Sequence, residues 1–365
     1  MNEARYDRQS LLPEIGAAGQ RRLANARVLC IGAGGLGCGA LPYLAAAGIG
    51  RITILDDDRV EESNLQRQVL FMESDLGRPK AEAAADQLAA RNSCIEVQAR
   101  CERLGIHNVR ELFEDHDVIV EGSDNFATKY LANDAGVKFG VPVVYASAIG
   151  FEAQVTVFDA DHGPCLRCLF PEPPTGWVPN CAEAGVLGPL VGMAGTIQAA
   201  ETIKLLVSEP GTGDLDSLTG RMWLLDARSM RPRQLPIEKN PECPVCSRPP
   251  KGIELVGADH EDEIDIPPGE ISDPGEVELI DVREADEFRT EHIPGARHLP
   301  LSQLVAEDIP PPESDRPCVV YCQRGPRGQQ AARLLSRQWQ REVRNLRGGL
   351  AGWTGSREGP THEDG

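Results

Sequence analysis

A glycine-rich turn at residues 32–37, Gly-Ala-Gly-Gly-Leu-Gly, carries the clearest chemical signal in this chain. It follows the apolar run Val28–Ile31, and glycines at this spacing are typical of a strand that turns into a helix beside a phosphate. In that pattern Gly34 lets the backbone approach the phosphate, and the first N–H groups of the helix face it. Asp56 ends the next apolar run, where such folds place the acid that binds a ribose hydroxyl. We therefore expect a nucleotide site, the alternative being a glycine turn kept for packing alone.

Two C-x-x-C pairs, Cys165 with Cys168 and Cys243 with Cys246, have the chemistry of a metal site. Four thiolates in two tight turns match tetrahedral zinc. The pairs are much farther apart than in a zinc finger, so the ion would join distant parts of one domain. A set of four cysteines leaves no position open for water, which favours a structural over a catalytic zinc. The alternatives are unrelated buried cysteines or a redox pair.

Cys322 ends the apolar run Cys318–Tyr321 and is followed by a loop that contains Gly325 and opens a helix. A cysteine in such a loop is surrounded by backbone N–H groups, and Arg324 and Arg327 add positive charge. These surroundings stabilise a thiolate and hold an anion. The sequence predicts a reactive thiol at Cys322, whereas the role of a small buried residue suits Cys318 better.

Two further charged residues have positions that suggest a ligand. Pro79 is a suitable first residue of a helix, which places Lys80 in a first turn where the helix dipole disfavours a cation unless an anion is near. A polar loop leading into a helix explains Lys80 equally well. Asp124 follows the apolar run Val118–Glu121, so it lies at the carboxyl end of a strand, where open α/β sheets bind ligands.

Apolar runs alternate with helical stretches, which predicts a mainly parallel sheet with helices on both faces. We expect strands at 28–31, 51–55, 95–99, 118–121, 141–146, 154–158 (antiparallel), 222–225, 278–283 and 318–321, and helices at 40–47, 81–90, 185–207 and 329–338.

Proline-rich segments divide the chain of 365 residues. We assign residues 1–249 to one domain, 250–272 to an extended acidic linker and 273–360 to a second domain. Within the first domain, residues 171–180 are rich in proline and glycine, which predicts an exposed, mobile loop that leads to Cys181.

The charge balance and the cysteine count exclude some functions. Asp and Glu number 56 against 37 Lys and Arg, a net charge of -19, which argues against nucleic acid and anionic membranes as partners. The start of the chain has no signal region, and no apolar run is long enough to suggest a membrane span. We expect a cytoplasmic protein, in which eleven cysteines indicate metal or thiol chemistry rather than disulfides.

Several stretches of the chain together form a recognisable set of motifs. They are Arg5–Gln9, Gly32–Gly37, Ser63–Gln68, Lys80, Asp124–Asn125, both cysteine pairs, Cys181–Gly185, Asp281–Glu284, His292–Ala296, Cys322–Arg327 and Leu346–Trp353. Through them, the first 249 residues resemble the ThiF/MoeB family, bacterial relatives of ubiquitin-activating enzymes. From residue 280 onward the chain resembles a rhodanese domain, and its six-residue C-x-x-G-x-R loop is typical of a sulfurtransferase rather than a phosphatase. The combination is similar to adenylyltransferase–sulfurtransferases of the MoeZ/MoeBR type.

This resemblance implies an α/β fold, with a Rossmann-like doubly wound mixed sheet followed by a smaller α/β rhodanese domain. The segment 270–278 is too short for the usual opening strand and helix of a rhodanese, so we expect that domain to be trimmed or to lean on the first.

The resemblance also implies a reaction. ATP adenylates the C-terminal Gly-Gly carboxylate of a small ubiquitin-like sulfur carrier protein, and a persulfide on Cys322 then gives the carrier thiocarboxylate. Cys181 would resolve the acyl disulfide or form a covalent adduct, and Arg8 would reach the partner's ATP across a homodimer formed by the N-terminal domain. The implied cofactors are ATP, Mg²⁺ (on Asp124) and Zn²⁺, and the implied nucleotide-site residues are Gly32, Gly34, Gly35, Gly37, Asp56, Asp58, Ser63, Asn64, Arg67, Lys80, Asp124 and Asn125.

The sequence leaves the pathway open. The carrier would serve molybdenum cofactor, thiamin, cysteine, tRNA-thiolation or natural-product synthesis, and the sulfur donor would be a cysteine desulfurase or thiosulfate. Two other functions compete with this one. An NAD-dependent oxidoreductase would use the glycine turn and Asp56, and a non-catalytic scaffold would carry a degenerate rhodanese domain. The first leaves Lys80 and both cysteine pairs without a role, and the intact loop after Cys322 argues against the second.

Overall fold

The computed structural model describes residues 3–174, 184–208, 215–256, 264–271 and 274–359. The chain divides into two compact units, with the change near residue 258. Each unit has its own sheet and its own hydrophobic core.

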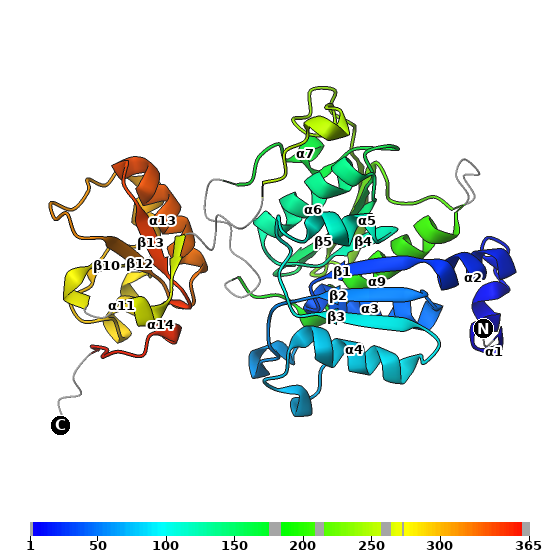
Figure 1. Cartoon of the computed structure of the whole chain (residues 1–365), viewed down its shortest axis with the longest axis horizontal. Helices are drawn as coiled ribbons and strands as arrows, with labels where there is room; N and C mark the ends of the chain where they lie inside the picture. Colours follow the sequence, from blue (N-terminus) through cyan, green and yellow to red (C-terminus); the bar gives the residue numbers. More distant parts are fainter. Residues whose placement is uncertain (1–2, 175–183, 209–214, 257–263, 272–273, 360–365) are drawn as a thin grey trace. The chain divides into compact units, whose positions relative to one another are not determined.

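The first unit contains an eight-stranded sheet with the order β3-β2-β1-β4-β5-β6-β7-β8 (Figure 1). The pairs from β3 to β5 are parallel and those from β5 to β8 are antiparallel, so the sheet is mixed, as predicted. The strand order reverses between β1 and β4, and open sheets of this kind bind ligands beyond the strand ends at that point. The strands are β1 (Arg27–Ile31), β2 (Arg51–Leu55), β3 (Glu96–Arg100), β4 (Val118–Glu121), β5 (Val143–Ile149), β6 (Glu152–Phe158), β7 (Arg221–Asp226) and β8 (Arg231–Pro236).

Alternate residues of β1 point to two different cores, which confirms a sheet covered on both faces. Val28 and Cys30 pack with α3, α4 and α9, whereas Leu29 and Ile31 pack with α5 and α6 (Figure 1). This double burial explains why β1 consists almost entirely of apolar residues. The helices of this unit are α1 (Glu3–Ser10), α2 (Gly16–Asn25), α3 (Gly35–Ala47), α4 (Lys80–Arg91), α5 (Val109–Glu114), α6 (Phe126–Phe139), α7 (Leu166–Leu169) and α9 (Gly188–Val207).

Contrary to the expectation from the sequence, α9 is by length and composition apolar enough to cross a membrane, and it is the one such helix in the described part of the chain. Half of its most apolar window is nevertheless buried within the protein. Its small residues pack against α3, since a Cβ at Gly195 would lie 2.1 Å from the carbonyl oxygen of Leu36. These contacts are those of a core helix.

The second unit contains a five-stranded parallel sheet with the order β11-β10-β12-β13-β9. Its strands are β9 (Asp265–Ile266), β10 (Glu278–Asp281), β11 (Arg297–His298), β12 (Cys318–Tyr321) and β13 (Val343–Leu346). Its helices are α11 (Ala285–Thr290), α12 (Leu301–Ala306), α13 (Pro326–Trp339) and α14 (Gly349–Gly352).

The structure differs from the predicted linker, residues 250–272, at both of its ends. Ile253 is buried with Cys165 and Cys243 in the first unit, and Asp265 and Ile266 pair with β13 in the second. Each end contains an apolar residue that packs against one of the two units, whereas an extended solvated segment would leave such residues exposed. Strand β9 also supplies the opening strand that residues 270–278 are too short to hold. The second unit is therefore less trimmed at its N-terminal side than the sequence predicts.

Candidate functional sites

The glycine turn lies at the reversal of strand order, between the carboxyl ends of β1 and β4. Gly32 has a φ of 90°, and a Cβ there would lie 3.0 Å from the carbonyl oxygen of Gly122 at the end of β4. A Cβ at Gly37 would lie 2.2 Å from the carbonyl oxygen of Gly32, so α3 starts in close contact with the end of β1. Gly34 differs, because the atom nearest to a Cβ there is Nε2 of Gln68 at 3.9 Å. Packing does not require glycine at position 34, and the space over it is open to a ligand.

Asp56, at the end of β2, holds this turn in place. Its Oδ2 accepts a hydrogen bond from the N–H of Ala33 at 2.7 Å, and its Oδ1 accepts one from the N–H of Asp58 at 2.9 Å. Burial raises the pKa of Asp56, while Lys80 and the two N–H donors act in the opposite direction. The carboxylate therefore lies beside the glycine turn, where the sequence places it, and also closes the turn.

Lys80 is the first residue of α4, and its side chain is only 7 % exposed. Its Nζ lies 2.8 Å from Oδ2 of Asp58, whose side chain is 65 % exposed. Burial alone would lower the pKa of Lys80, but the carboxylates of Asp58, Asp56 and Asp124 outweigh burial and raise it. The site thus contains a buried cation whose direct partner can turn into solvent.

Asp124 lies in the loop after β4 and is exposed, and no hydrogen bond or ion pair engages its carboxylate in the described part of the chain. Its neighbour Asn125 caps α6 by accepting a backbone N–H bond. The loop rests on a buried ion pair in which Nζ of Lys129 lies 2.5 Å from Oε2 of Glu121. Glu121 also accepts the N–H of Ser123 at 2.9 Å, so the pair fixes the start of the loop that presents Asp124.

The segment after β2 brings a second cation to the turn. Asn64 is buried, and its Oδ1 accepts a backbone N–H at 3.2 Å. Arg67 donates from Nη1 to the carbonyl oxygen of Ser63 at 2.9 Å. Burial raises the pKa of the Cys38 thiol in α3 to about 12, and both Lys80 and Arg67 oppose that shift. Gln68, the next residue after Arg67, is the side chain nearest to Gly34, so this segment runs beside the glycine turn.

Two of the predicted catalytic residues are not placed at this site. Cys181 lies outside the described residues. Arg8 is exposed on α1, and across the described ranges it forms no hydrogen bond or ion pair.

The two cysteine pairs meet at one point, as the sequence predicts. The sulfur of Cys165 lies 3.5 Å from that of Cys243, and the sulfur of Cys168 lies 3.4 Å from that of Cys246. All four lie within 4.8 Å of one another. Zn–S bonds of about 2.3 Å in a tetrahedron separate the sulfurs by about 3.8 Å, so the four side chains fit one zinc ion.

In the second unit, Cys322 is 1 % exposed and lies at the end of β12. Its Sγ accepts the N–H of Gly325 at 3.1 Å, and a φ of 118° at that glycine turns the loop around the sulfur. The carbonyl oxygens of Cys322 and Gln323 accept N–H bonds from Leu350 at 2.8 Å and Ala351 at 2.9 Å. Because the start of α14 satisfies these carbonyls, the loop can turn N–H groups toward the sulfur.

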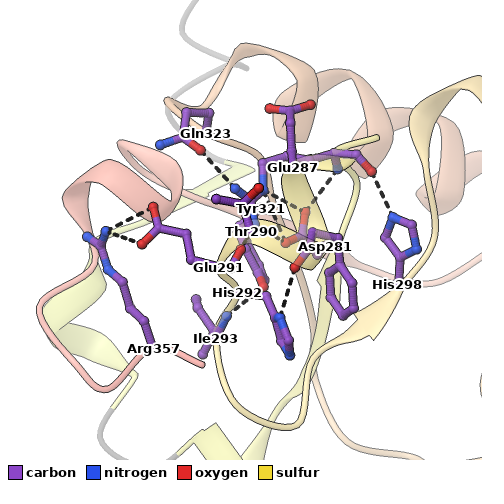
Figure 2. Close-up of polar contacts among 12 residues, drawn as sticks. Asp281, Glu287, Thr290, Glu291, His292, Ile293, His298, Tyr321, Gln323 and Arg357 are labelled. Carbon is purple, nitrogen blue, oxygen red and sulfur yellow. Dashed lines mark hydrogen bonds and ion pairs between the residues drawn. The ribbon is translucent and has the colours of Figure 1, made fainter. Parts of the chain in front are cut away.

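Two arginines beside this loop are already paired. The two Nη atoms of Arg327 each lie 2.7 Å from an oxygen of Glu287, and these bonds lower the pKa of Glu287. The buried Arg283 binds both oxygens of Asp281 and donates to Oε1 of Gln323 at 2.9 Å. Figure 2 labels both of these partners, Asp281 and Gln323. The positive charge that the sequence leads us to expect from Arg327 is therefore largely compensated, whereas Arg324 is exposed.

Sequence reasoning missed the partners that orient these groups. Lys129 and Glu121 carry charge inside a buried helix and a buried strand, and a buried charge normally has a partner, so that signal was present. Glu287 had no comparable signal, because it lies in an acidic exposed stretch and its partner is 40 residues away.

Comparisons with known proteins cover both units. The model of the ThiF family matches residues 6–245, and that of the rhodanese-like domain matches residues 269–356. The "Probable adenylyltransferase/sulfurtransferase MoeZ" of Mycobacterium tuberculosis is 40 % identical over 366 residues, which is 96 % of this chain and 92 % of that protein. The "Sulfur carrier protein adenylyltransferase" of Thermus thermophilus is 46 % identical over 258 residues, which is 69 % of this chain and 93 % of that protein. Among solved structures, E. coli MccB with MccA-N7isoASN has a TM-score of 0.58 at 25 % identity and covers 68 % of this chain and 75 % of its own.

Proposed function

The chain belongs to the ThiF family and carries a rhodanese-like domain after it, and on that premise we propose that it performs two linked reactions. It adenylates the C-terminal Gly-Gly carboxylate of a small ubiquitin-like sulfur carrier protein with ATP, and it then converts the activated carboxylate to a thiocarboxylate. It is an adenylyltransferase and sulfurtransferase, like the relatives that carry those names. The observation that carries the proposal is the buried Lys80 beside an open glycine turn in the same chain as the Cys322 loop.

In the first reaction, an oxygen of the carrier carboxylate bonds to the α-phosphorus of ATP, and the bond from that phosphorus to pyrophosphate breaks. This displacement needs positioning and neutralisation of charge more than it needs a base. We assign Lys80, Asn64 and Arg67 to the phosphates and Asp56 to the ribose. Since Asp58 is 65 % exposed, Lys80 can exchange that carboxylate for a phosphate oxygen with little rearrangement.

The residues present fit the two implied metal ions. Asp124 offers an exposed carboxylate, the hard oxygen ligand that magnesium prefers; the ion would neutralise charge on the phosphates. The four cysteines would hold zinc as a structural ion, because they fill all of its positions. We expect one zinc per chain by elemental analysis, and its loss in Cys243→Ser.

In the second reaction, the outer sulfur of a persulfide on Cys322 attacks the acyl carbon of the adenylate. The bond from that carbon to the phosphate oxygen breaks and AMP leaves, which gives an acyl disulfide. A second thiolate then attacks the Cys322 sulfur and releases the thiocarboxylate, leaving a disulfide that an external thiol reduces. We assign this thiolate to Cys181, which alternatively forms a covalent adduct with the carrier.

We also propose a homodimer that forms through the first unit, with Arg8 reaching the ATP of the partner. Leu11 and Leu12 directly follow α1 and are 71 % and 50 % exposed, which suits a contact surface beside Arg8. The sulfur donor would be a cysteine desulfurase or thiosulfate, and the protein would act in the cytoplasm.

Exchange of labelled pyrophosphate into ATP tests the first reaction. We expect exchange only when a carrier with a C-terminal Gly-Gly is present, since its carboxylate is the attacking group. A carrier that lacks the last glycine is the control. Nicotinamide reduction without any exchange would contradict the proposal and favour an oxidoreductase.

A further inference from the structure

Asp265, in the first strand of the second unit, contacts the helix that follows Cys322. Asp265, in β9, accepts a hydrogen bond on Oδ1 from Nδ2 of Asn345 at 2.7 Å and another on Oδ2 from Nε2 of Gln329 at 3.0 Å. Asn345 is fully buried in β13, and Gln329 lies near the start of α13. The carboxylate of Asp265 thus links β13 to α13, the helix that follows the Cys322 loop.

The amide of Asn345 is oriented by this contact. Since its Nδ2 donates to Asp265, its Oδ1 faces the other way, toward the first turn of α13. A Cβ at Gly328 would lie only 1.9 Å from this oxygen and 3.4 Å from the backbone nitrogen of Cys322. Oδ1 of Asn345 is buried and accepts no hydrogen bond from the described residues. It is an acceptor that lies under the N–H end of a helix, where the helix dipole is positive.

The position of the first turn of α13 determines whether a backbone N–H contacts the sulfur of Cys322. Gly325, which precedes α13, supplies the N–H that lies 3.1 Å from Sγ. A shift of the first turn of α13 would therefore move this N–H relative to the sulfur. If the amide of Asn345 rotated, its NH₂ group would face the N–H end of the helix, and donor would meet donor.

We propose that Asp265 is a positioning residue for sulfur transfer at Cys322. Acting through Asn345, its carboxylate keeps an acceptor oxygen under the first turn of α13 and so holds the N–H of Gly325 on the sulfur. The inference rests on the proposed sulfurtransferase activity and adds a residue from the predicted linker to that site.

The test uses the full chain, thiosulfate and cyanide. The outer sulfur of thiosulfate moves to the Cys322 thiolate and sulfite leaves; cyanide then removes that sulfur as thiocyanate and restores the thiolate. The rate of discharge by cyanide is measured in a single turnover on enzyme whose persulfide content is known from its mass. Because the rate is divided by the persulfide content, a variant that only folds less well shows an unchanged rate per loaded site.

We expect Asp265→Ala and Asn345→Asp each to lower this rate about tenfold, because a displaced group near the reacting atom costs rate steeply. In the double variant Asp265→Asn with Asn345→Asp, the amide and the carboxylate exchange places. The amide then donates to the carboxylate, and an acceptor oxygen still faces Gly328. We expect the double variant to recover the rate to within about twofold.

Asp308→Ala is the matched control. Asp308 accepts a hydrogen bond from Nε2 of Gln338 at 3.1 Å at the far end of the same helix, so its removal deletes a similar Asp–Gln bond away from the loop. Its rate should equal that of the unsubstituted chain.

An unchanged rate per loaded site in Asp265→Ala overturns the proposal, as does a double variant that is no faster than Asn345→Asp. If Asn345→Asp does not fold, the contrast between Asp265→Ala and Asp308→Ala decides alone. An unsubstituted chain that transfers no sulfur overturns the proposed sulfurtransferase activity instead.

Discussion

The two candidate sites share one plan and differ in how their charged side chains are held. Each follows a buried parallel strand with a glycine turn and a helix, at residues 32–37 in the first unit and 322–327 in the second. At the first site, Lys80 pairs with a mostly exposed carboxylate. At the second, Arg327 and Arg283 are each held by a carboxylate through two or more hydrogen bonds.

This difference matches the charge that each site must handle. A triphosphate brings a large charge that redistributes as the α-phosphorus is attacked, so cations with exchangeable partners can follow it. A single sulfur on Cys322 needs a fixed surrounding of backbone dipoles. Arg283 holds the loop through its bond to Gln323, and the N–H of Gly325 contacts the sulfur directly.

The largest expected effect separates the two sites completely. Cys322→Ala should abolish transfer of sulfur from thiosulfate to cyanide, because the residue that carries the sulfur is gone. Carrier-dependent exchange of pyrophosphate into ATP should be unchanged, since that reaction takes place in the first unit. Cys318→Ala, in the same strand, is the control. Loss of exchange along with sulfur transfer would show that the sites do not work independently.

Lys80→Ala should produce the reverse pattern. We expect exchange of pyrophosphate into ATP to slow by roughly 10²–10³-fold, the usual cost of removing one preorganised donor. Sulfur transfer from thiosulfate to cyanide should keep its rate. Lys251→Ala, which removes an exposed lysine from the same unit, is the control. Unchanged exchange would refute the role of Lys80.

The paired arginines of the second site predict a smaller effect, on stability. Glu287→Gln removes the charge that Arg327 holds through two bonds of 2.7 Å. A hydrogen bond to a charged group contributes about 1.5–3 kcal/mol, so we expect the free energy of unfolding of the second unit to fall by about that amount. Glu313→Gln, at an exposed residue whose side chain forms no hydrogen bond or ion pair within the described ranges, is the control in denaturant unfolding followed by hydrogen exchange. Equal effects of the two substitutions would remove the distinction drawn between the sites.

The smallest effect is a difference in acid sensitivity between the units. Burial lowers the pKa of His116, whose Nε2 lies 2.7 Å from Oγ1 of Thr53 in the first unit. A lowered pKa gives stability that is complete above the ordinary value of 6.5 and is lost as the pH falls toward the folded value. The bonds from Arg327 likewise lower the pKa of Glu287, so its contribution is lost only below the ordinary value of 4.5.

Hydrogen exchange on peptides from each unit checks this order. Between pH 6.5 and 4.5 the first unit should lose protection before the second. His116→Gln should reduce the loss of protection with falling pH over this range in the first unit, and should leave the second unit unchanged. Simultaneous loss of protection in both units would contradict the assignment.

Several strands inside the two sheets were predictable because they are buried on both faces, but β13, which lies between β12 and β9, was not predicted. The runs at β2, β4 and β12 were placed at the observed bounds, since a parallel strand between two layers of helices consists of consecutive apolar residues that stop at a turn. Strand β8 gave no such signal because all of its residues are exposed. Strand β9 has only two residues, in a stretch whose acidic and proline-rich composition indicates a linker.

Local spacing selected the candidate site residues, and their ligands stay predictions. Lys80, Asp56 and the four cysteines were chosen in this way; the structure brings the four sulfurs together and holds Asp56 against the glycine turn. The pairing of Arg327 with Glu287 could not be predicted, because it depends on two segments 40 residues apart in the sequence. The spacing also did not reveal that Asp56 accepts a hydrogen bond from the glycine turn and so holds the turn in place.

The intact mass of a purified Gly-Gly carrier tests the central claim most directly. The carrier is incubated with an equal amount of the full chain, ATP and thiosulfate, so that one turnover per chain is enough, and each small molecule is then left out in turn. The account predicts that sulfur replaces one oxygen only when both are present, and that the acyl adenylate accumulates with ATP alone. A carrier that gains sulfur without ATP, or that stays unchanged with both, would contradict it.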